Sequence, residues 1–196
     1  MQIVEKYYSG KNAHSYNQSR IGNSKWKAEQ QYVENFIRSN EDIKTVIDAP
    51  AGTGRFHSVV ETSFHVEKAY GYELSDDMLE QARFTNTRKW DYVKLDLINE
   101  NIPVKGDLTV CIRMLNLINE EDALAITRNI LQSSNKYVIV GLRHHDDPGD
   151  WIDEKVFCQN RKVIYSEFKK NFKLKDYKEI NTGRKGKYGL ICLERK

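Results

Sequence analysis

The stretch that decides the fold is Asp48-Ala49-Pro50-Ala51-Gly52-Thr53-Gly54-Arg55-Phe56, which follows a short apolar run. Gly52 and Gly54 allow a sharp turn and a close approach to a ligand, and the amides that open the next helix offer a positive dipole end. The third glycine of a nicotinamide fingerprint and the Gly-Lys-Ser/Thr of a P-loop are both missing. The segment therefore predicts either a binding site for another polar ligand or a tight strand-to-helix turn.

Short apolar runs and helical patterns alternate outward from this stretch. A glutamate ends the second run and an aspartate follows the third, and Ser75 is placed to cap a helix. Alternation of this kind is typical of a parallel sheet with helices on both faces. The expected strands are 45–47, 68–72, 92–95, 108–112 and 137–142, and the expected helices are 25–38, 55–63, 76–83 and 120–132.

The end of the chain departs from this alternation. Residues 173–180 and 188–194 read as two strands joined by a glycine-containing turn too short for a helix. Two strands joined in this way must be antiparallel. The predicted fold class is therefore α/β, a doubly wound, mostly parallel, seven-stranded Rossmann-like sheet whose last strand is antiparallel.

Two further acids stand where a nucleoside ligand would need them. Glu73 closes the second strand, 25 residues after Asp48, where a carboxylate accepts hydrogen bonds from ribose hydroxyls. Asp96 follows the third strand, where it could accept from an adenine amino group. The turn and the two acids together favour an adenosine-containing ligand.

With these residues in view, the chain resembles class I S-adenosylmethionine-dependent methyltransferases over about residues 25–196. The motifs are Asp48–Phe56, Gly71-Tyr-Glu-Leu-Ser-Asp-Asp-Met-Leu-Glu-Gln-Ala-Arg, Asp96, and Asp107-Leu-Thr-Val-Cys-Ile-Arg-Met-Leu-Asn-Leu-Ile. Pro50 stands where the family usually has its first glycine, and proline fixes φ and removes a donor. We expect an altered loop with binding retained.

The resemblance implies which residues hold the cofactor, S-adenosyl-L-methionine. Asp48 would act on its amine through the loop, Glu73 on the ribose and Asp96 on the adenine amine. Arg113, just past the fourth strand, would line the methyl-transfer end. The implied cofactor-binding set is Asp48, Ala49, Gly52, Gly54, Glu73, Leu74, Met78, Asp96, Leu97 and Arg113.

The methyl acceptor should lie beyond the carboxyl ends of the strands, among the loops at 113–119, 143–151 and 182–187. His144 or His145 could act as a general base near neutral pH, although neighbours on an extended chain point opposite ways. Contiguous ligands rarely enclose one ion, so no metal is expected. The candidate catalytic residues are His144, His145 and Arg113, and the candidate substrate residues are Tyr16, Arg20, Arg143 and Arg184.

Composition and charge set the remaining expectations. The chain has 196 residues, 39% of them hydrophobic, no repeat and no linker, which predicts one methyltransferase domain over 1–196. Within it, residues 1–40 would form an N-terminal helical lid or extension and 41–196 the Rossmann-like core. Apolar runs are far shorter than the ~18 residues of a membrane span. With neither a secretory signal nor paired cysteines in view, we expect a cytoplasmic protein with no membrane partner.

Several functions remain open at this point. Residues 161–196 hold twelve Lys/Arg against four Asp/Glu, an excess that suits either a solvated face or an anionic partner. A methyltransferase acting on an O or N nucleophile of a small molecule is the preferred reading. Methylation of RNA or another polyanion through the basic hairpin, a non-catalytic S-adenosylmethionine-binding module, and a dehydrogenase on the same fold are the alternatives.

Overall fold

The computed structural model describes residues 10, 15, 16, 18, 20, 22–84, 88–145, 157–181 and 187–196, with the backbone alone at residue 145. The chain folds as two compact units, residues 1–100 and 101–196. The single domain over 1–196, with an N-terminal extension up to residue 40, stays a prediction. No helix in the described ranges is long and apolar enough to cross a membrane.

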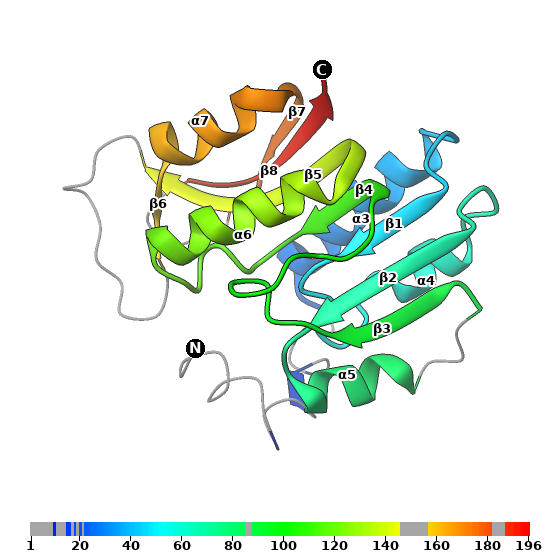
Figure 1. Ribbon diagram of the computed structural model, residues 1–196. Coiled ribbons are helices and arrows are strands. Elements are labelled where there is room, and N and C mark those ends of the chain that lie inside the picture. Colours follow the sequence, from blue (N-terminus) through cyan, green and yellow to red (C-terminus); the bar gives the residue numbers. More distant parts are fainter. Residues whose placement is uncertain are drawn as a thin grey trace. The chain divides into compact units, whose positions relative to one another are not determined.

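The first unit contains three parallel strands in the order β3-β2-β1 (Figure 1). Asp48, the last residue of β1, pairs with Gly71, and Glu73, the last residue of β2, pairs with Lys94. The carboxyl ends of all three strands therefore meet at one edge, as predicted. The strands are β1 (Thr45–Asp48), β2 (Lys68–Glu73) and β3 (Trp90–Lys94), and the helices are α3 (Ser24–Arg38), α4 (His57–Glu61) and α5 (Asp76–Arg83).

Polar side chains fix where these helices begin. The Ser75 hydroxyl accepts from the Met78 amide at 3.3 Å, which confirms the predicted cap of α5. Asn23 caps α3 by accepting from the amides of Lys25 and Trp26. Each cap satisfies amides that have no partner inside their own helix.

The second unit contains the strand order β4-β5-β8-β7, with β6 paired to the end of β5. β4 and β5 are parallel, whereas β8 runs antiparallel to both β5 and β7. The strand orders and directions in the two units confirm the predicted fold class, including the antiparallel hairpin at the end of the chain. The strands are β4 (Gly106–Cys111), β5 (Ser134–His145), β6 (Gln159–Asn160), β7 (Phe172–Glu179) and β8 (Lys187–Arg195), and the helices are α6 (Glu120–Gln132) and α7 (Arg161–Asn171).

Two features of the second unit differ from the sequence prediction. Helix α7 was not expected, and it lies beside α6 on the same face of the strands (Figure 1). β5 extends to His145, so Arg143 and His144 are strand residues rather than members of a loop. Strand pairing explains the extension, because Arg143 pairs with Tyr188 of β8 and His144 with Gln159 of β6.

A buried ion pair connects α3 to the turn after β1. Arg55 Nη1 lies 2.8 Å from Glu29 Oε2, and the two side chains are 8% and 0% exposed. The guanidinium also donates to the Trp26 carbonyl oxygen, and its Cζ lies 3.9 Å from the centroid of the Trp26 ring. These contacts satisfy a charge that burial would otherwise make costly.

Tyr92 of β3 forms the floor of the same turn. A Cβ atom on Gly71 would lie 2.4 Å from Tyr92 Cδ1, and one on Gly54 would lie 2.9 Å from the Tyr92 hydroxyl oxygen. The Tyr92 ring also stacks on Trp90, with the two centroids 5.2 Å apart. The ring occupies space that two glycines leave open, so these glycines are required by packing.

Replacing Gly71 by alanine should therefore destabilise the protein by about 1–3 kcal/mol, the usual result of overpacking a core. Ala51 Cβ would be only 3.0 Å from the new atom, so little room is left for relief. Urea denaturation of Gly71→Ala, Tyr92→Leu and the double variant measures the effect. The double variant should be more stable than the sum of the single effects predicts, and strict additivity would contradict the contact.

Removing Glu29 should be more damaging still, because it leaves the Arg55 charge buried. Glu29→Ala is expected to lower the free energy of unfolding by about 3–5 kcal/mol. Glu34→Ala is the matched control on the same helix, since the Glu34–Arg38 pair is 26% and 58% exposed and should contribute below about 0.5 kcal/mol. Equal losses in the two variants would show that the buried pair has no special role.

Candidate functional site

The Glu73 carboxylate is the centre of the candidate site in the first unit. Glu73 Oε2 accepts from the Gly52 amide at 3.0 Å, and Oε1 accepts from the amides of Leu74 and Ser75 at 2.9 and 3.0 Å. A carboxylate offers about four lone-pair positions, and these amides use three of them. Glu73 therefore fixes the shape of the glycine turn and keeps limited capacity for a ligand hydroxyl.

Asp48 and Glu73 form a buried acidic pair. Burial raises the pKa of Asp48 well above its usual range, the nearby Arg55 charge opposes that shift, and Glu73 adds to it. Burial also raises the pKa of Glu73, against the lowering effect of its three amide hydrogen bonds. A cation placed beside these groups would favour their ionised forms.

The glycine turn is open toward one side. Gly52 and Gly54 have φ values of +56° and +79°, in the left-handed region that favours glycine. A Cβ atom on Gly52 would meet no heavy atom within 4 Å among the described residues, apart from its chain neighbours. A ligand can therefore approach the backbone closely at Gly52. The Ala49–Pro50 peptide bond, earlier in the same turn, is cis.

Asp96 lies two residues after the end of β3 and is half-buried. Its Oδ1 accepts from the Ile98 amide at 3.0 Å, and its Oδ2 accepts from Asn99 Nδ2 at 2.8 Å. The side chain thus closes a turn, and both oxygens keep a lone pair for another donor. An adenine amino group is one donor that it could accept.

The other predicted cofactor residues of the first unit differ in how accessible they are. Leu74 is half-buried at the carboxyl edge and follows Glu73 directly. Ala49, Met78 and Leu97 are 0%, 2% and 5% exposed. Leu74 can therefore contact a ligand directly, and the other three side chains support the walls around it.

Two predicted substrate residues gather with Trp26 beside the glycine turn. Tyr16 packs edge-on against Trp26, with the ring centroids 5.9 Å apart. Arg20 Cζ lies 5.0 Å from the Tyr16 ring centroid and 6.0 Å from the Trp26 ring centroid. The Trp26 ring also contacts the Arg55 guanidinium. Contacts between aromatic rings and guanidinium groups thus connect Tyr16 and Arg20 to the glycine turn.

In the second unit, two arginines share one aromatic ring. Arg113 Cζ and Arg143 Cζ lie 5.5 and 5.7 Å from the centroid of Tyr188. Arg113 follows β4 and has φ +67°, a conformation that few non-glycine residues adopt. The structure thus brings together a predicted catalytic residue and a predicted substrate residue.

The predicted histidines are placed differently. His144 is 3% exposed, and its ring lies 6.4 Å from the rings of both Tyr165 in α7 and Tyr177 in β7. Successive strand residues point to opposite faces, so His144 faces α7 while Arg143 faces away from it. This burial does not favour His144 as a general base. The His145 side chain and Arg184 lie outside the described residues.

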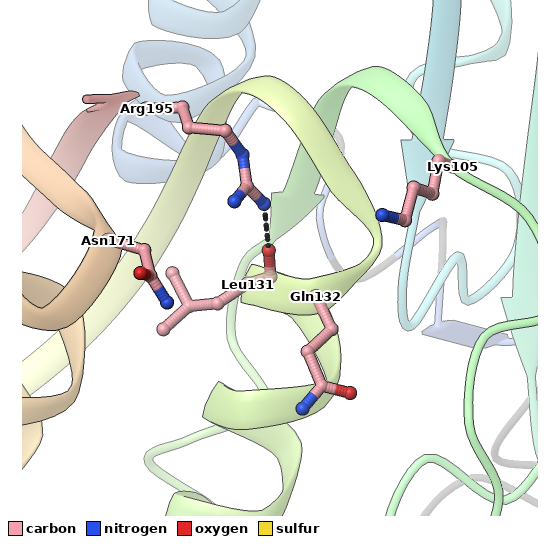
Figure 2. A pocket seen from close by; sticks show the side chains of 5 residues that line it. All are labelled: Lys105, Leu131, Gln132, Asn171 and Arg195. Carbon is pink, nitrogen blue, oxygen red and sulfur yellow. Dashed lines mark hydrogen bonds between the residues drawn. The ribbon is translucent and has the colours of Figure 1, made fainter.

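A pocket of about 330 Å³ lies at the other end of the second unit, beside the last turn of α6 (Figure 2). Arg195 donates there from Nη2 to the Leu131 carbonyl oxygen at 3.0 Å. The pocket is near the start of β4, whereas ligands of parallel sheets bind beyond the carboxyl ends. Its lining is Lys105, Leu131, Gln132, Asn171 and Arg195.

Sequence reasoning missed three residues that shape the site. Glu29 is one of several charged residues in its predicted helix, and Arg55 is the first residue of the next predicted helix. Tyr92 is the first residue of a predicted strand, and nothing in the local pattern distinguishes any of the three. The signal available for Arg55 was its position directly after Gly54, where a long cation can reach back over the preceding helix.

Comparisons with known proteins rest on structure. No protein-family model matches the sequence, and no curated protein matches it. Magnesium protoporphyrin IX methyltransferase from Synechocystis PCC 6803 with bound SAM matches 100% of this chain and 96% of its own, at TM-score 0.78 and 12% identity. Human N-acetylserotonin methyltransferase in complex with SAM matches at TM-score 0.69 and 12% identity, covering 99% of this chain and 59% of its own.

A third match is the small RNA methyltransferase HEN1, at TM-score 0.67 and 13% identity, covering 87% of this chain and 25% of its own. Small-molecule and RNA methyltransferases are thus both similar in structure to this chain. The resemblance inferred from the sequence motifs is confirmed for the fold: the chain has the fold of class I S-adenosylmethionine-dependent methyltransferases.

Proposed function

We propose that the chain is an S-adenosylmethionine-dependent methyltransferase that transfers a methyl group to an O or N nucleophile of a small molecule. The observation that supports this best is the set of acids at the ends of three successive strands. Asp48 and Glu73 are the last residues of β1 and β2, and Asp96 lies two residues after β3. The glycine turn beside them is open at Gly52. Such a set of acceptors can bind the amine, the ribose hydroxyls and the adenine amino group of an adenosine-linked cation.

The residues present fit this cofactor in charge as well as in position. Two buried carboxyls with raised pKa values favour a ligand that brings positive charge. When bound, the cofactor would supply an activated methyl group on a sulfonium. Glu73 would accept from the ribose with its remaining lone pair, Asp96 would accept from the adenine amine, and Leu74 would contact a face of the adenine ring.

The chain's main task in this reaction would be positioning. Holding a donor and a nucleophile in line makes the reaction effectively unimolecular, so few catalytic groups are needed. The glycine turn packs on Tyr92 and is attached to α3 by the Arg55–Glu29 pair. It is therefore suited to hold the methyl donor in place. Arg113 after β4 and His145 at the end of β5 remain the catalytic residues that we propose. A metal-free, cytoplasmic enzyme remains our expectation.

A second candidate function is methylation of RNA or another polyanion. β7 carries Lys173, Lys175 and Lys178 on an exposed strand, although Lys173 and Lys175 are paired with Glu194. Binding through phosphates would weaken steeply as salt rises, whereas a small acceptor would respond little. The third possibility is a module that binds S-adenosylmethionine without transferring its methyl group. Such a module would bind the cofactor in calorimetry but would release no demethylated product.

Glu73→Gln tests the assignment, because its amide NH2 would face backbone N–H donors that now point at an acceptor. We expect the affinity for S-adenosylmethionine to fall at least about tenfold, or about 1.4 kcal/mol. Isothermal titration calorimetry measures it, with Glu80→Gln on the exposed face of α5 as the control. No binding by the wild type, or equal binding by Glu73→Gln, would refute the proposal.

Asp48→Asn should stabilise the ligand-free protein at neutral pH. The unfolded carboxyl has a pKa of about 3.9 and the folded one a raised pKa, so the folded state retains a proton that the unfolded state has lost. The free energy of unfolding therefore falls as pH rises between the two values, by about 1.4 kcal/mol per unit of difference.

The amide that replaces the carboxyl in Asp48→Asn does not ionise, so the variant should lose this decline and exceed the wild type at pH 7. Urea denaturation at pH 4 and pH 7 measures the difference, with Asp91→Asn as the control because Asp91 is 54% exposed beside Lys68. If Asp48→Asn were less stable than the wild type at pH 7, the buried carboxylate would be a net stabilising group instead.

A further inference from the structure

The pocket beside the last turn of α6 is lined by four separate segments of the second unit (Figure 2). Lys105 comes from the loop before β4, Leu131 and Gln132 from the end of α6, Asn171 from the end of α7 and Arg195 from the end of β8. Its volume of about 330 Å³ is within the range of small-molecule sites. The pocket shares no residue with the candidate cofactor site.

Contacts with the protein hold Arg195 in one orientation at this pocket. Its Nε donates to the Ser134 carbonyl oxygen at 3.1 Å, and its Nη2 donates to the Leu131 carbonyl oxygen at 3.0 Å. Its Cζ lies 4.7 Å from the ring centroid of Phe172, which is 2% exposed. A guanidinium has five N–H donors, and the two on Nη1 have no hydrogen-bond partner among the described residues. Arg195 therefore keeps two donors for a ligand.

Backbone carbonyl groups at the ends of α6 and α7 have donors within the protein. The Gly106 amide donates to the Ser133 carbonyl oxygen at 2.9 Å, and the Lys196 amide donates to the Asn171 carbonyl oxygen at 3.0 Å. The two carbonyl oxygens that Arg195 reaches belong to the same region. Free carbonyl groups at a helix C-terminus would attract a cation, but these four are already paired.

The side chains that line the pocket carry two positive charges, on Lys105 and Arg195, and no negative charge. Neither of these two side chains forms an ion pair within the part of the chain that the structure describes. The acids that are close in sequence, Asp107 and Glu194, pair with other lysines. The pocket therefore combines an excess of positive charge with unused hydrogen-bond donors, which favours an anionic ligand.

We propose that this pocket binds a sugar phosphate or a similar small phosphate monoester. A phosphate monoester carries a charge of about −1.5 to −2 near pH 7 and three acceptor oxygens, which match the charges and donors of Lys105 and Arg195. The side-chain amides of Gln132 and Asn171 both donate and accept, so they suit the hydroxyl groups of a sugar. The proposed site does not depend on the proposed methyl transfer.

Ribose 5-phosphate is a suitable probe for the full chain, and ribose is its neutral control. Titration calorimetry should find that ribose 5-phosphate binds at least about tenfold more tightly than ribose, because only the phosphate balances the two positive charges. Inorganic phosphate should bind more weakly than ribose 5-phosphate, since it has no sugar hydroxyls for the two amides. Equal affinity for ribose and ribose 5-phosphate, or no binding of either, would overturn the inference. Inorganic phosphate that binds as tightly as ribose 5-phosphate would overturn the assignment of a sugar phosphate.

Variants locate the binding. Lys105→Gln should weaken ribose 5-phosphate at least about tenfold, and Lys105 is exposed, so its removal should leave the fold intact. Lys162→Gln is the matched control: it makes the same change of charge at an exposed position near the start of α7, whereas Asn171 ends that helix. It should leave the affinity unchanged. Equal affinity of Lys105→Gln and the wild type, or equal losses in Lys105→Gln and Lys162→Gln, would refute the site.

Two further measurements distinguish this pocket from other sites that could take the probe. Saturating S-adenosylmethionine should not displace ribose 5-phosphate, because the pocket and the candidate cofactor site have no residue in common. Displacement would place the probe at the cofactor site and overturn the inference. An oligouridylate that binds more than about tenfold tighter than ribose 5-phosphate, and loses that affinity in Lys105→Gln, would show that the pocket serves a nucleic-acid backbone instead.

Discussion

The hydrogen bonds between the Glu73 carboxylate and three backbone amides hold the candidate cofactor site together. They join the turn after β1 to the end of β2, so neither segment can change shape without the other. Two residues of the turn have positive φ, which only glycine adopts without cost. The hydrogen bonds to the Glu73 carboxylate thus offset the conformational entropy that the glycine-rich turn loses when it adopts one conformation. It also spends most of its accepting capacity inside the protein, so a ribose would compete with backbone amides for it.

Two further contacts constrain the glycine turn. Tyr92 fills the space beneath Gly54 and Gly71, and the buried Arg55–Glu29 pair attaches the turn to α3. These contacts place carboxylates and a guanidinium in a region with little water, where each charge affects the pKa of the others. Asp48 has its pKa raised because burial outweighs the attraction of Arg55. A constrained turn beside two buried acids with raised pKa values is the arrangement on which the proposed binding of a cationic ligand depends.

The sequence predicted the features that depend on local pattern and strand order. Alternating runs predicted β1 to β5, the closing hairpin and the Ser75 cap, and strand ends predicted the places of Glu73 and Asp96. It did not predict α7, in which the buried apolar residues Ile164 and Phe168 share the helix with three lysines and an arginine. Glu29 and Tyr92 could not be assigned, because their roles depend on contacts with residues far away in the sequence. The length of β5 was missed for the same reason, since its pairing with β6 and β8 extends it.

The length of β5 decides which groups can meet an acceptor. In a loop, Arg143 and His144 could both have turned toward the same ligand. In a strand they must alternate, and the ring contacts of His144 with Tyr165 and Tyr177 assign it to the face that α7 covers. Arg143 then lies on the opposite face with Tyr188 and Arg113. The strand therefore separates two side chains that a loop could have placed side by side, and only Arg143 of the two lies with Tyr188.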